Sequence, residues 1–186
     1  MPSKIIIKNL IKIYGKKHLA ALKLFREGKT RDYILQSTGN VLGLADISLE
    51  INQGEIFVLM GLSGSGKSTL ARCINRLIHP TSGHIYIDDE DVAHADETRM
   101  RDIRLNKVSM VFQRFGLFPH KTVAENVEYG LKVRGVERIN RRQKAIETLE
   151  VVGLAKWADY KPTSLSGGMQ QRVGLARALA TDAEIL

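Results

Sequence analysis

The sequence predicts an α/β protein built around a phosphate-binding loop, on three observations. Residues 61–69 read Gly-Leu-Ser-Gly-Ser-Gly-Lys-Ser-Thr, which matches the P-loop pattern. The nearly all-apolar segment 55–60 comes immediately before it and is typical of a buried parallel strand. Apolar residues at positions 70, 73, 74 and 77 follow it and predict one face of an amphipathic helix. A strand, a glycine-rich loop and a helix in this order are the context that a P-loop requires.

The loop has the residue types that phosphate binding needs. Its small residues at positions 63–66 let several backbone amides point at one polyphosphate without side-chain clashes. The ammonium group of Lys67 is expected to reach the β and γ phosphates, and the Ser68 hydroxyl is expected to bind Mg²⁺. The N-terminus of the next helix adds about half a positive charge. The loop therefore predicts a nucleotide site.

Length and composition favour a cytoplasmic protein of one domain, or of one domain with a subdomain. The chain has 186 residues, of which 44% are hydrophobic, which is enough for a substantial core. It contains no apolar run of about 18 residues, and the apolar segment near its start is too short for a signal peptide. The single cysteine, Cys73, excludes an internal disulfide and is expected to be a core residue.

The positive charge is concentrated at the start of the chain. Residues 1–40 have nine Lys or Arg and two Asp or Glu, whereas residues 41–186 have nineteen and eighteen. The basic residues are not interleaved with aromatic ones, so no nucleic-acid partner is expected. A solvated basic surface and attraction to an anionic membrane surface are the two interpretations.

The first half of the chain predicts further strands with an insertion between two of them. Residues 4–10 and 45–51 are expected to form strands, the second of them alternating and antiparallel. Residues 16–42 between them are expected to be an insertion with helices at 19–27 and 31–36. Thr30 is expected to cap the second helix and Gly39 to end it.

The middle of the chain predicts a strand over residues 84–87 and an apolar strand over residues 108–112. The second strand would carry Gln113 to its carboxyl end, where ligands bind in open α/β sheets. The acidic run 88–91 fits no calcium loop and is expected to be a solvated turn, and the histidines show no ligand spacing. Residues 123–160 have mainly helical periodicity.

A second anion-binding helix end is predicted near the C-terminus. Ser166 is placed to cap a helix that runs through Ala180, and Gly167 and Gly168 leave the first amides of that helix uncovered. The chain thus has two predicted phosphate-binding ends about a hundred residues apart.

With these parts in order, the sequence resembles the ATP-binding subunits of ABC transporters. The matching parts are the aromatic Tyr14, the loop 61–69, Gln113 and the Leu-Ser-Gly-Gly segment 165–168. The resemblance implies an α/β P-loop NTPase fold (ABC ATPase) with a RecA-like core, an antiparallel β subdomain and a helical subdomain. It implies a nucleotide-binding core over residues 1–122, a helical subdomain over 123–165, and a signature helix with the start of the next strand over 166–186.

The resemblance also assigns roles to individual residues, with ATP and Mg²⁺ as cofactors. Lys67 and Gln113 are the implied catalytic residues, and Ser68 and Gln113 the implied Mg²⁺ ligands. The implied nucleotide-binding residues are Tyr14, which would stack on adenine, Gly61, Ser63, Gly64, Ser65, Gly66, Lys67, Ser68, Thr69, Gln113, Ser166, Gly167 and Gly168.

The implied partners follow from the same resemblance. Two ATPase subunits would form a head-to-tail homodimer in which the signature residues 166–168 of one subunit contact the γ-phosphate held by the other. The groove near residues 115–123 would receive a transmembrane permease, and a substrate-binding protein would act indirectly. The subunit would lie in the cytoplasm, peripheral to the inner face of the cell membrane.

Within the family, the sequence resembles the ATPases of importers for glycine betaine, proline betaine and related osmoprotectants. The resemblance rests on the insertion between Tyr14 and Gly43 and on the amino-acid sequences of residues 55–69 and 75–83. An ABC ATPase for another small solute such as an amino acid, and a soluble ABC ATPase without a permease, are the alternatives. A transport assay with competing solutes distinguishes the first alternative from an importer of osmoprotectants.

Three residues of the family pattern have no counterpart in these 186 positions. They are the Walker B aspartate, the catalytic glutamate and the switch histidine, which would follow residues 183–186. The chain is therefore expected to be a fragment of a longer ATPase, to bind nucleotide and to hydrolyse it very weakly alone, because metal and water would be poorly held.

Overall fold

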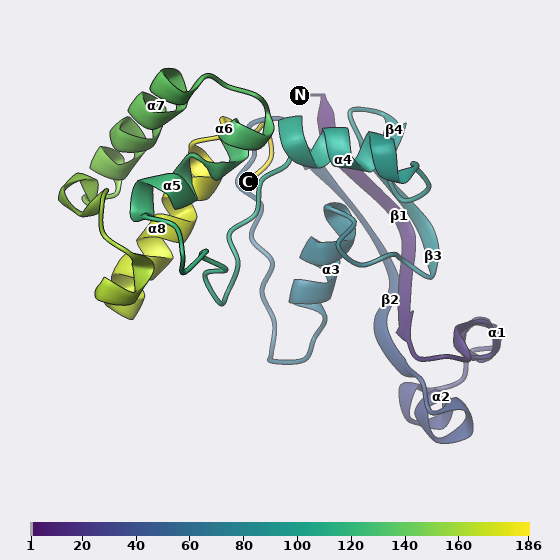
Figure 1. Ribbon diagram of the computed structural model, residues 1–186. Coiled ribbons are helices and arrows are strands. Elements are labelled where there is room, and N and C mark those ends of the chain that lie inside the picture. Colours follow the sequence, from purple (N-terminus) through teal and green to yellow (C-terminus); the bar gives the residue numbers. More distant parts are fainter. Residues whose placement is uncertain (1) are drawn as a thin grey trace. The chain divides into compact units, whose positions relative to one another are not determined.

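The computed structural model describes residues 2–186, and the chain divides into two compact units, Met1–Met100 and Arg101–Leu186. Each unit is described by itself. The first contains the sheet and the phosphate-binding loop, and the second is mainly helical (Figure 1). Of the described residues, none forms a helix long and apolar enough to span a membrane.

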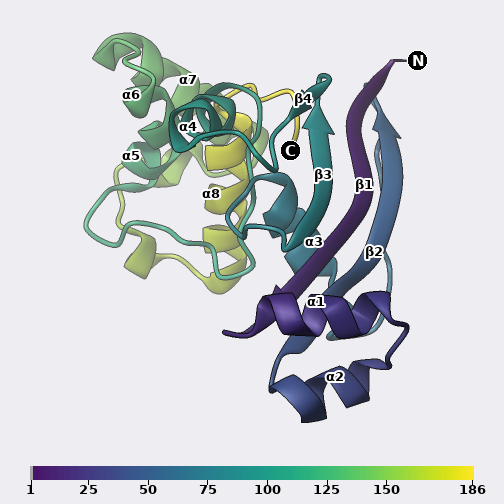
Figure 2. The same cartoon turned by 90° about the vertical axis from the view of Figure 1, so that its right-hand side faces the viewer.

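The first unit is organised on a four-stranded antiparallel sheet with the order β2-β1-β3-β4 (Figure 2). Its strands are β1 (Ser3–Tyr14), β2 (Val41–Asn52), β3 (Ser82–Ile87) and β4 (Glu90–Asp91). Ile7 pairs with Leu49 of β2 on one side and with Ile85 of β3 on the other. Alternate side chains of β1 and β3 are buried, among them Ile5, Ile7, Ile85 and Ile87. The strands predicted at 4–10, 45–51 and 84–87 are confirmed, and all three are longer than predicted.

The predicted insertion forms two short helices, α1 (His18–Arg26) and α2 (Arg31–Thr38), next to one end of β1 and β2 (Figures 1 and 2). The Thr30 hydroxyl accepts a hydrogen bond from the Tyr33 amide, and Gly39 ends α2 with φ of 69°. Both signals were predicted and are confirmed. The helices attach through a small apolar cluster of Ile11, Ile13, Ala21, Leu22, Ile34 and Leu42.

Two further helices begin in the first unit, after β2 along the chain. The helix α3 (Lys67–Ile74) begins at the end of the phosphate-binding loop, with Leu70 and Cys73 buried as predicted. Leu77, the last position of the predicted apolar face, lies beyond the helix and is exposed. The helix α4 (Glu97–Asn106) follows the β3–β4 hairpin.

The predicted parallel strand 55–60 is not formed. Residues 55–62 have no secondary structure, and Ile56 and Met60 are 91% and 86% exposed. An apolar parallel strand is stable when other strands bond to its edges and helices cover both of its faces. Among residues 2–186 no strand pairs with this segment, so its local preference alone does not form a strand.

The predicted strand 108–112 is reduced to a single bridge. Val108 pairs in parallel with Ile185, through hydrogen bonds from the Ser109 amide to Ile185 (2.8 Å) and from the Ile185 amide to Lys107 (3.0 Å). Val111 and Phe112 are 37% and 40% exposed. One bridge offers too few ladder bonds to extend a strand through these residues.

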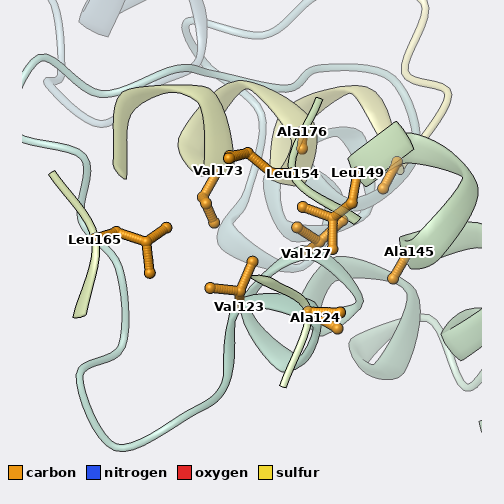
Figure 3. Close-up of a cluster of buried hydrophobic side chains, with 11 residues drawn as sticks. Val123, Ala124, Val127, Ala145, Leu149, Leu154, Leu165, Val173 and Ala176 are labelled. Atoms are coloured by element: carbon orange, nitrogen blue, oxygen red, sulfur yellow. The ribbon is translucent and has the colours of Figure 1, made fainter. Parts of the chain in front are cut away.

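The second unit is mainly helical, and residues 123–160, for which the sequence predicts helical periodicity, form helices in it. Its helices are α5 (Val123–Val127), α6 (Tyr129–Val133), α7 (Arg138–Val151) and α8 (Gly167–Leu179), with 3-10 turns at Ala155–Trp157 and Pro162–Ser164. The apolar faces of α5, α7 and α8 meet in one core, shown in Figure 3. Val127, Leu149 and Val173 come from three of these helices and are fully buried there. This core holds α8, whose first residues are the predicted signature.

Arg76 ties the chain after α3 to the segment after β4. It is buried, and its Nη1 donates to the carbonyl oxygens of Val92 (3.1 Å) and Ala93 (3.3 Å). Its Nη2 donates to Glu97 Oε1 at 2.9 Å. Removal of a buried cation that satisfies several carbonyl groups leaves those groups without partners, which is costly.

We therefore expect Arg76→Ala to lower the free energy of unfolding by about 3 kcal/mol. Urea denaturation followed by circular dichroism measures this loss. Arg72→Ala is the matched control, because Arg72 lies in the last turn of α3 and is exposed. Equal stability of the two variants would contradict the structural role of Arg76.

Candidate nucleotide-binding site

The phosphate-binding loop is an open backbone turn in the first unit. Gly61, Gly64 and Gly66 have φ of 156°, 80° and 99°. A Cβ at Gly66 would lie 2.8 Å from the carbonyl oxygen of Gly43 on β2. Glycine is therefore required at this position by both the backbone conformation and the close approach of β2.

The side chain of Lys67 closes this loop. Its ammonium nitrogen lies 2.6 Å from the carbonyl oxygen of Gly61, 2.7 Å from that of Leu62 and 3.4 Å from Ser65 Oγ. The positive charge thus lies inside the turn formed by the loop backbone. A phosphate oxygen that enters this turn would meet the charge directly.

The loop backbone also leaves hydrogen-bond donors available. Of the amides of residues 61–66, only that of Ser65 donates to a backbone carbonyl in the described chain, to Leu62 at 3.2 Å. The first amides of α3 have no acceptor within the helix, and its dipole places partial positive charge at the same end. Ser68, at the second position of α3, is exposed.

These features fit a bound polyphosphate. The loop combines free amides, a lysine ammonium and left-handed glycines around one space, and a Cβ added at Gly64 would meet no atom within 4 Å. Inward-pointing amides in such a turn form an anion-binding concavity. The Ser68 hydroxyl is a hard oxygen donor of the kind that Mg²⁺ accepts.

Tyr14 lies beside the same loop. Its hydroxyl is 3.0 Å from Thr69 Oγ1 in the first turn of α3, and its side chain is 38% exposed. The Lys12 ammonium lies 5.2 Å from the centroid of its ring. The structure thus brings the aromatic residue at the end of β1 to the helix that begins with Lys67.

Gly43 also belongs to this site. The sequence identifies Gly43 only as the residue at which the insertion ends. A Cβ there would lie 2.7 Å from Cε2 of Tyr14, and its carbonyl oxygen is the one that approaches Gly66. A glycine in a strand indicates that another group comes close to the backbone, but it does not say which group. Only the fold identifies the Tyr14 ring and the loop as those groups.

Cys73 packs below the loop as a structural residue. It is fully buried in α3, and burial raises the pKa of its thiol to about 11, while the charge of Lys12 lowers it by less. The thiol is therefore neutral near pH 7 and unreactive. This confirms the prediction of a small core residue.

The other predicted site residues lie in the second unit. Gln113 is exposed in a turn, and the segment after it is held on α8 by Arg177, which donates to the carbonyl oxygens of Phe115 (2.8 Å) and Gly116 (2.6 Å). Burial lowers the pKa of Arg177 below its ordinary value. The shared role of Gln113 with the residues of the first unit stays a prediction.

The signature segment forms the N-terminus of α8. Ser166 is its N-cap, and the Ser166 hydroxyl accepts a hydrogen bond from the Met169 amide at 3.4 Å. Gly167 and Gly168 are exposed, and a Cβ on either would meet nothing within 4 Å. Among the described residues, the amides of Gly167 and Gly168 have no backbone acceptor, and anion binding at this helix end stays a prediction.

A charged pocket of about 530 Å³ lies next to the end of the predicted permease groove. It includes Lys121 and Thr122 from that segment. Five cationic and three acidic side chains line it, together with Thr122 and Tyr129; they are Lys121, Lys132, Arg138, Arg141, Arg142, Glu125, Glu128 and Asp159. Glu125 also completes the capping box of α5 with Thr122. The Thr122 amide donates a hydrogen bond to the Glu125 carboxylate, and this bond lowers the pKa of the Glu125 carboxyl.

The chain has an α/β fold with this loop before α3, and it therefore belongs to the class of P-loop proteins. More specifically, the sequence profile of the family described as "ABC transporter" matches residues 44–186, and the chain belongs to that family.

Relatives and solved structures agree with this assignment. The chain is 51% identical over 185 residues to the glycine betaine transport ATP-binding protein OpuAA of Bacillus subtilis (100% of this chain, 44% of the relative). It is 50% identical over 186 residues to the glycine betaine/proline betaine transport system ATP-binding protein ProV of Escherichia coli (100% and 46%). The ATP-binding cassette MJ0796, solved as a dimer in a post-hydrolysis state with ADP and Pi, matches with a TM-score of 0.79 and 35% identity, over 96% of this chain and 70% of that one.

These matches confirm the predicted fold class. The chain spans less than half the length of the two transport proteins.

The geometry of the loop predicts how glycine substitutions affect stability. We expect Gly66→Ala to destabilise the first unit by about 2 to 3 kcal/mol, because a left-handed backbone and the contact with Gly43 both oppose a Cβ. Gly64→Ala is the control: it has a left-handed backbone but open space, so we expect about 1 kcal/mol. Thermal unfolding of the two variants measures the difference in stability. Equal losses of stability would show that the contact between residue 66 and β2 does not oppose a Cβ.

Proposed function

We propose that this chain is the ATP-binding part of the energising subunit of an ABC importer for glycine betaine, proline betaine or related osmoprotectants. The observation that carries the proposal is the loop 61–69, in which the Lys67 ammonium, loop amides without backbone acceptors and the N-terminus of α3 lie together. The names of the two relatives, each about half identical over the whole chain, support the solute class.

In this proposal the loop binds the phosphates of ATP. The amides and Lys67 bind the β and γ phosphates, and the Ser68 hydroxyl and Gln113 bind Mg²⁺. The metal neutralises phosphate charge when it is bound. Tyr14 stacks its ring on the adenine, and its hydroxyl bond to Thr69 holds that ring next to the loop. Lys67 and Gln113 are the proposed catalytic residues of this chain.

Two proposed partners complete the function. A second copy of the subunit docks head to tail, so that residues 166–168 of one subunit meet the phosphates bound by the other; the dimeric state of the MJ0796 cassette supports this arrangement. A membrane permease docks at the groove near residues 115–123, and the adjoining charged pocket offers it ion pairs. The subunit then lies at the inner face of the membrane, and a substrate-binding protein acts through the permease.

The nucleotide site is tested by ATP binding to three variants. Lys67→Ala is expected to weaken ATP binding by about 100-fold or more, since charge-assisted contacts to phosphate are lost. Tyr14→Ala is expected to weaken it by about 3- to 10-fold through lost stacking, and Tyr14→Phe, which keeps the ring, by less. Isothermal titration calorimetry with ATP and Mg²⁺ measures all three. Equal affinities of the parent and Tyr14→Ala would exclude the stacking role.

The transport function is tested in membrane vesicles that contain the whole transporter. We expect ATP-dependent uptake of glycine betaine, abolished by Lys67→Ala, with proline betaine competing and methionine not competing. Competition by an amino acid instead would favour the alternative solute class. ATP hydrolysis without any permease-dependent uptake would favour a soluble ABC ATPase.

A further inference from the structure

Three side chains with metal-binding atoms meet at the β3–β4 hairpin of the first unit. Asp91 Oδ2 lies 2.7 Å from Nδ1 of His84 and 2.9 Å from Nδ1 of His94. One ligand atom from each of the three residues lies within 4.8 Å of the other two. We propose that His84, Asp91 and His94 form a binding site for a divalent transition-metal ion of the Zn²⁺ type. The proposal does not depend on the nucleotide site.

The carboxylate is oriented by the backbone. Asp91 Oδ1 accepts a hydrogen bond from the Ala93 amide at 3.0 Å, which leaves Oδ2 to face both imidazole rings. A partner that holds one carboxylate oxygen and turns the other to the ion is typical of metal sites. The acidic ligand is therefore positioned before any ion binds.

The scaffold under the three ligands is firm. Asp91 pairs with Tyr86 across the hairpin, and the Val92 amide donates to the Ile85 carbonyl at 2.8 Å. Val92 is fully buried, and Arg76 binds the carbonyl oxygens of Val92 and Ala93. His84 and Asp91 thus lie on paired strands, which hold ligands more accurately than free loops, and His94 follows three residues after Asp91.

The ligand set indicates which ions fit. Two imidazole nitrogens and one carboxylate oxygen, with a solvent-facing fourth position, suit tetrahedral Zn²⁺ and related ions, whereas Mg²⁺ and Ca²⁺ prefer oxygen ligands alone. Around a tetrahedral ion with bonds near 2 Å, ligand atoms lie about 3.3 Å apart. The two observed separations of 2.7 and 2.9 Å are about half an ångström shorter.

The rings have room to make this adjustment. The side chains of His84 and His94 are 51% and 62% exposed, and their ring centroids lie 5.1 Å apart. A small outward movement of each ring admits the ion between them and Asp91. A neutral imidazole that carries its proton on Nε2 presents the Nδ1 lone pair to the ion.

The sequence did not indicate this site. Its spacing, with six residues between His84 and Asp91 and two between Asp91 and His94, matches no familiar metal pattern. The sequence predicts only a solvated turn over residues 88–91 and indicates no ligand role for the histidines. The antiparallel pairing of β3 with β4 is what brings the first histidine to the other two residues.

The test is a calorimetric titration of Zn²⁺ into the untagged, nucleotide-free protein. We expect one saturable ion per chain. His84→Ala, Asp91→Asn and His94→Gln are each expected to weaken binding by about 100-fold. His79→Ala is the matched control, because His79 is comparably exposed (65%) and lies 3.8 Å from a carboxylate oxygen, that of Glu97. It is expected to bind Zn²⁺ like the parent, and Mg²⁺ is expected not to bind at this site.

Thermal unfolding separates loss of the site from loss of the fold. Without metal, His94→Gln is expected to unfold at the temperature of the parent, because its side chain is largely exposed. With Zn²⁺, the parent and His79→Ala are expected to become more stable, and His94→Gln is not. Absence of saturable Zn²⁺ binding by the folded parent overturns the proposal, and so does undiminished binding by the folded His94→Gln variant.

Discussion

The pairing of β1 along both of its edges is the constraint on which the first unit depends. Because β1 bonds to β2 on one side and to β3 on the other, one register positions three strands at once. A shift by one residue would turn the buried face of β1 towards solvent, so burial of Ile5 and Ile7 sets this register. The same register places Tyr14 next to α3, and it fixes β3, which carries His84, in the sheet.

The phosphate-binding loop shows how charge and backbone geometry act together. Its left-handed glycines keep the chain in a tight turn, and this turn brings the carbonyl oxygens of Gly61 and Leu62 to the Lys67 ammonium. A lysine that lost these contacts without gaining others would leave its charge poorly solvated. An incoming phosphate offers stronger, charged acceptors, so the proposed binding exchanges weak partners for strong ones.

Predictions from the sequence agree best with the structure where the predicted feature involves only neighbouring residues. The Thr30 cap, the Gly39 stop, the Ser166 cap and the P-loop turn each depend on a few adjacent residues, and each occurs where the sequence predicts it. The strands predicted at 55–60 and 108–112 depend on partners elsewhere in the chain. Their apolar composition is typical of buried strands, but composition supplies no hydrogen bonds, and these segments lack the ladder that would make them strands.

The sequence by itself determined the family, the order of the family's characteristic segments and the residues of the phosphate-binding loop, because these are properties of short stretches of chain. Only the tertiary structure decided which distant groups meet. It placed Gly43 against both Tyr14 and Gly66, buried Arg76 under the segment after β4, and gathered His84, Asp91 and His94 at one hairpin. Contacts of this kind come from strand pairing and burial, which join residues far apart in the chain and leave no periodic pattern in it.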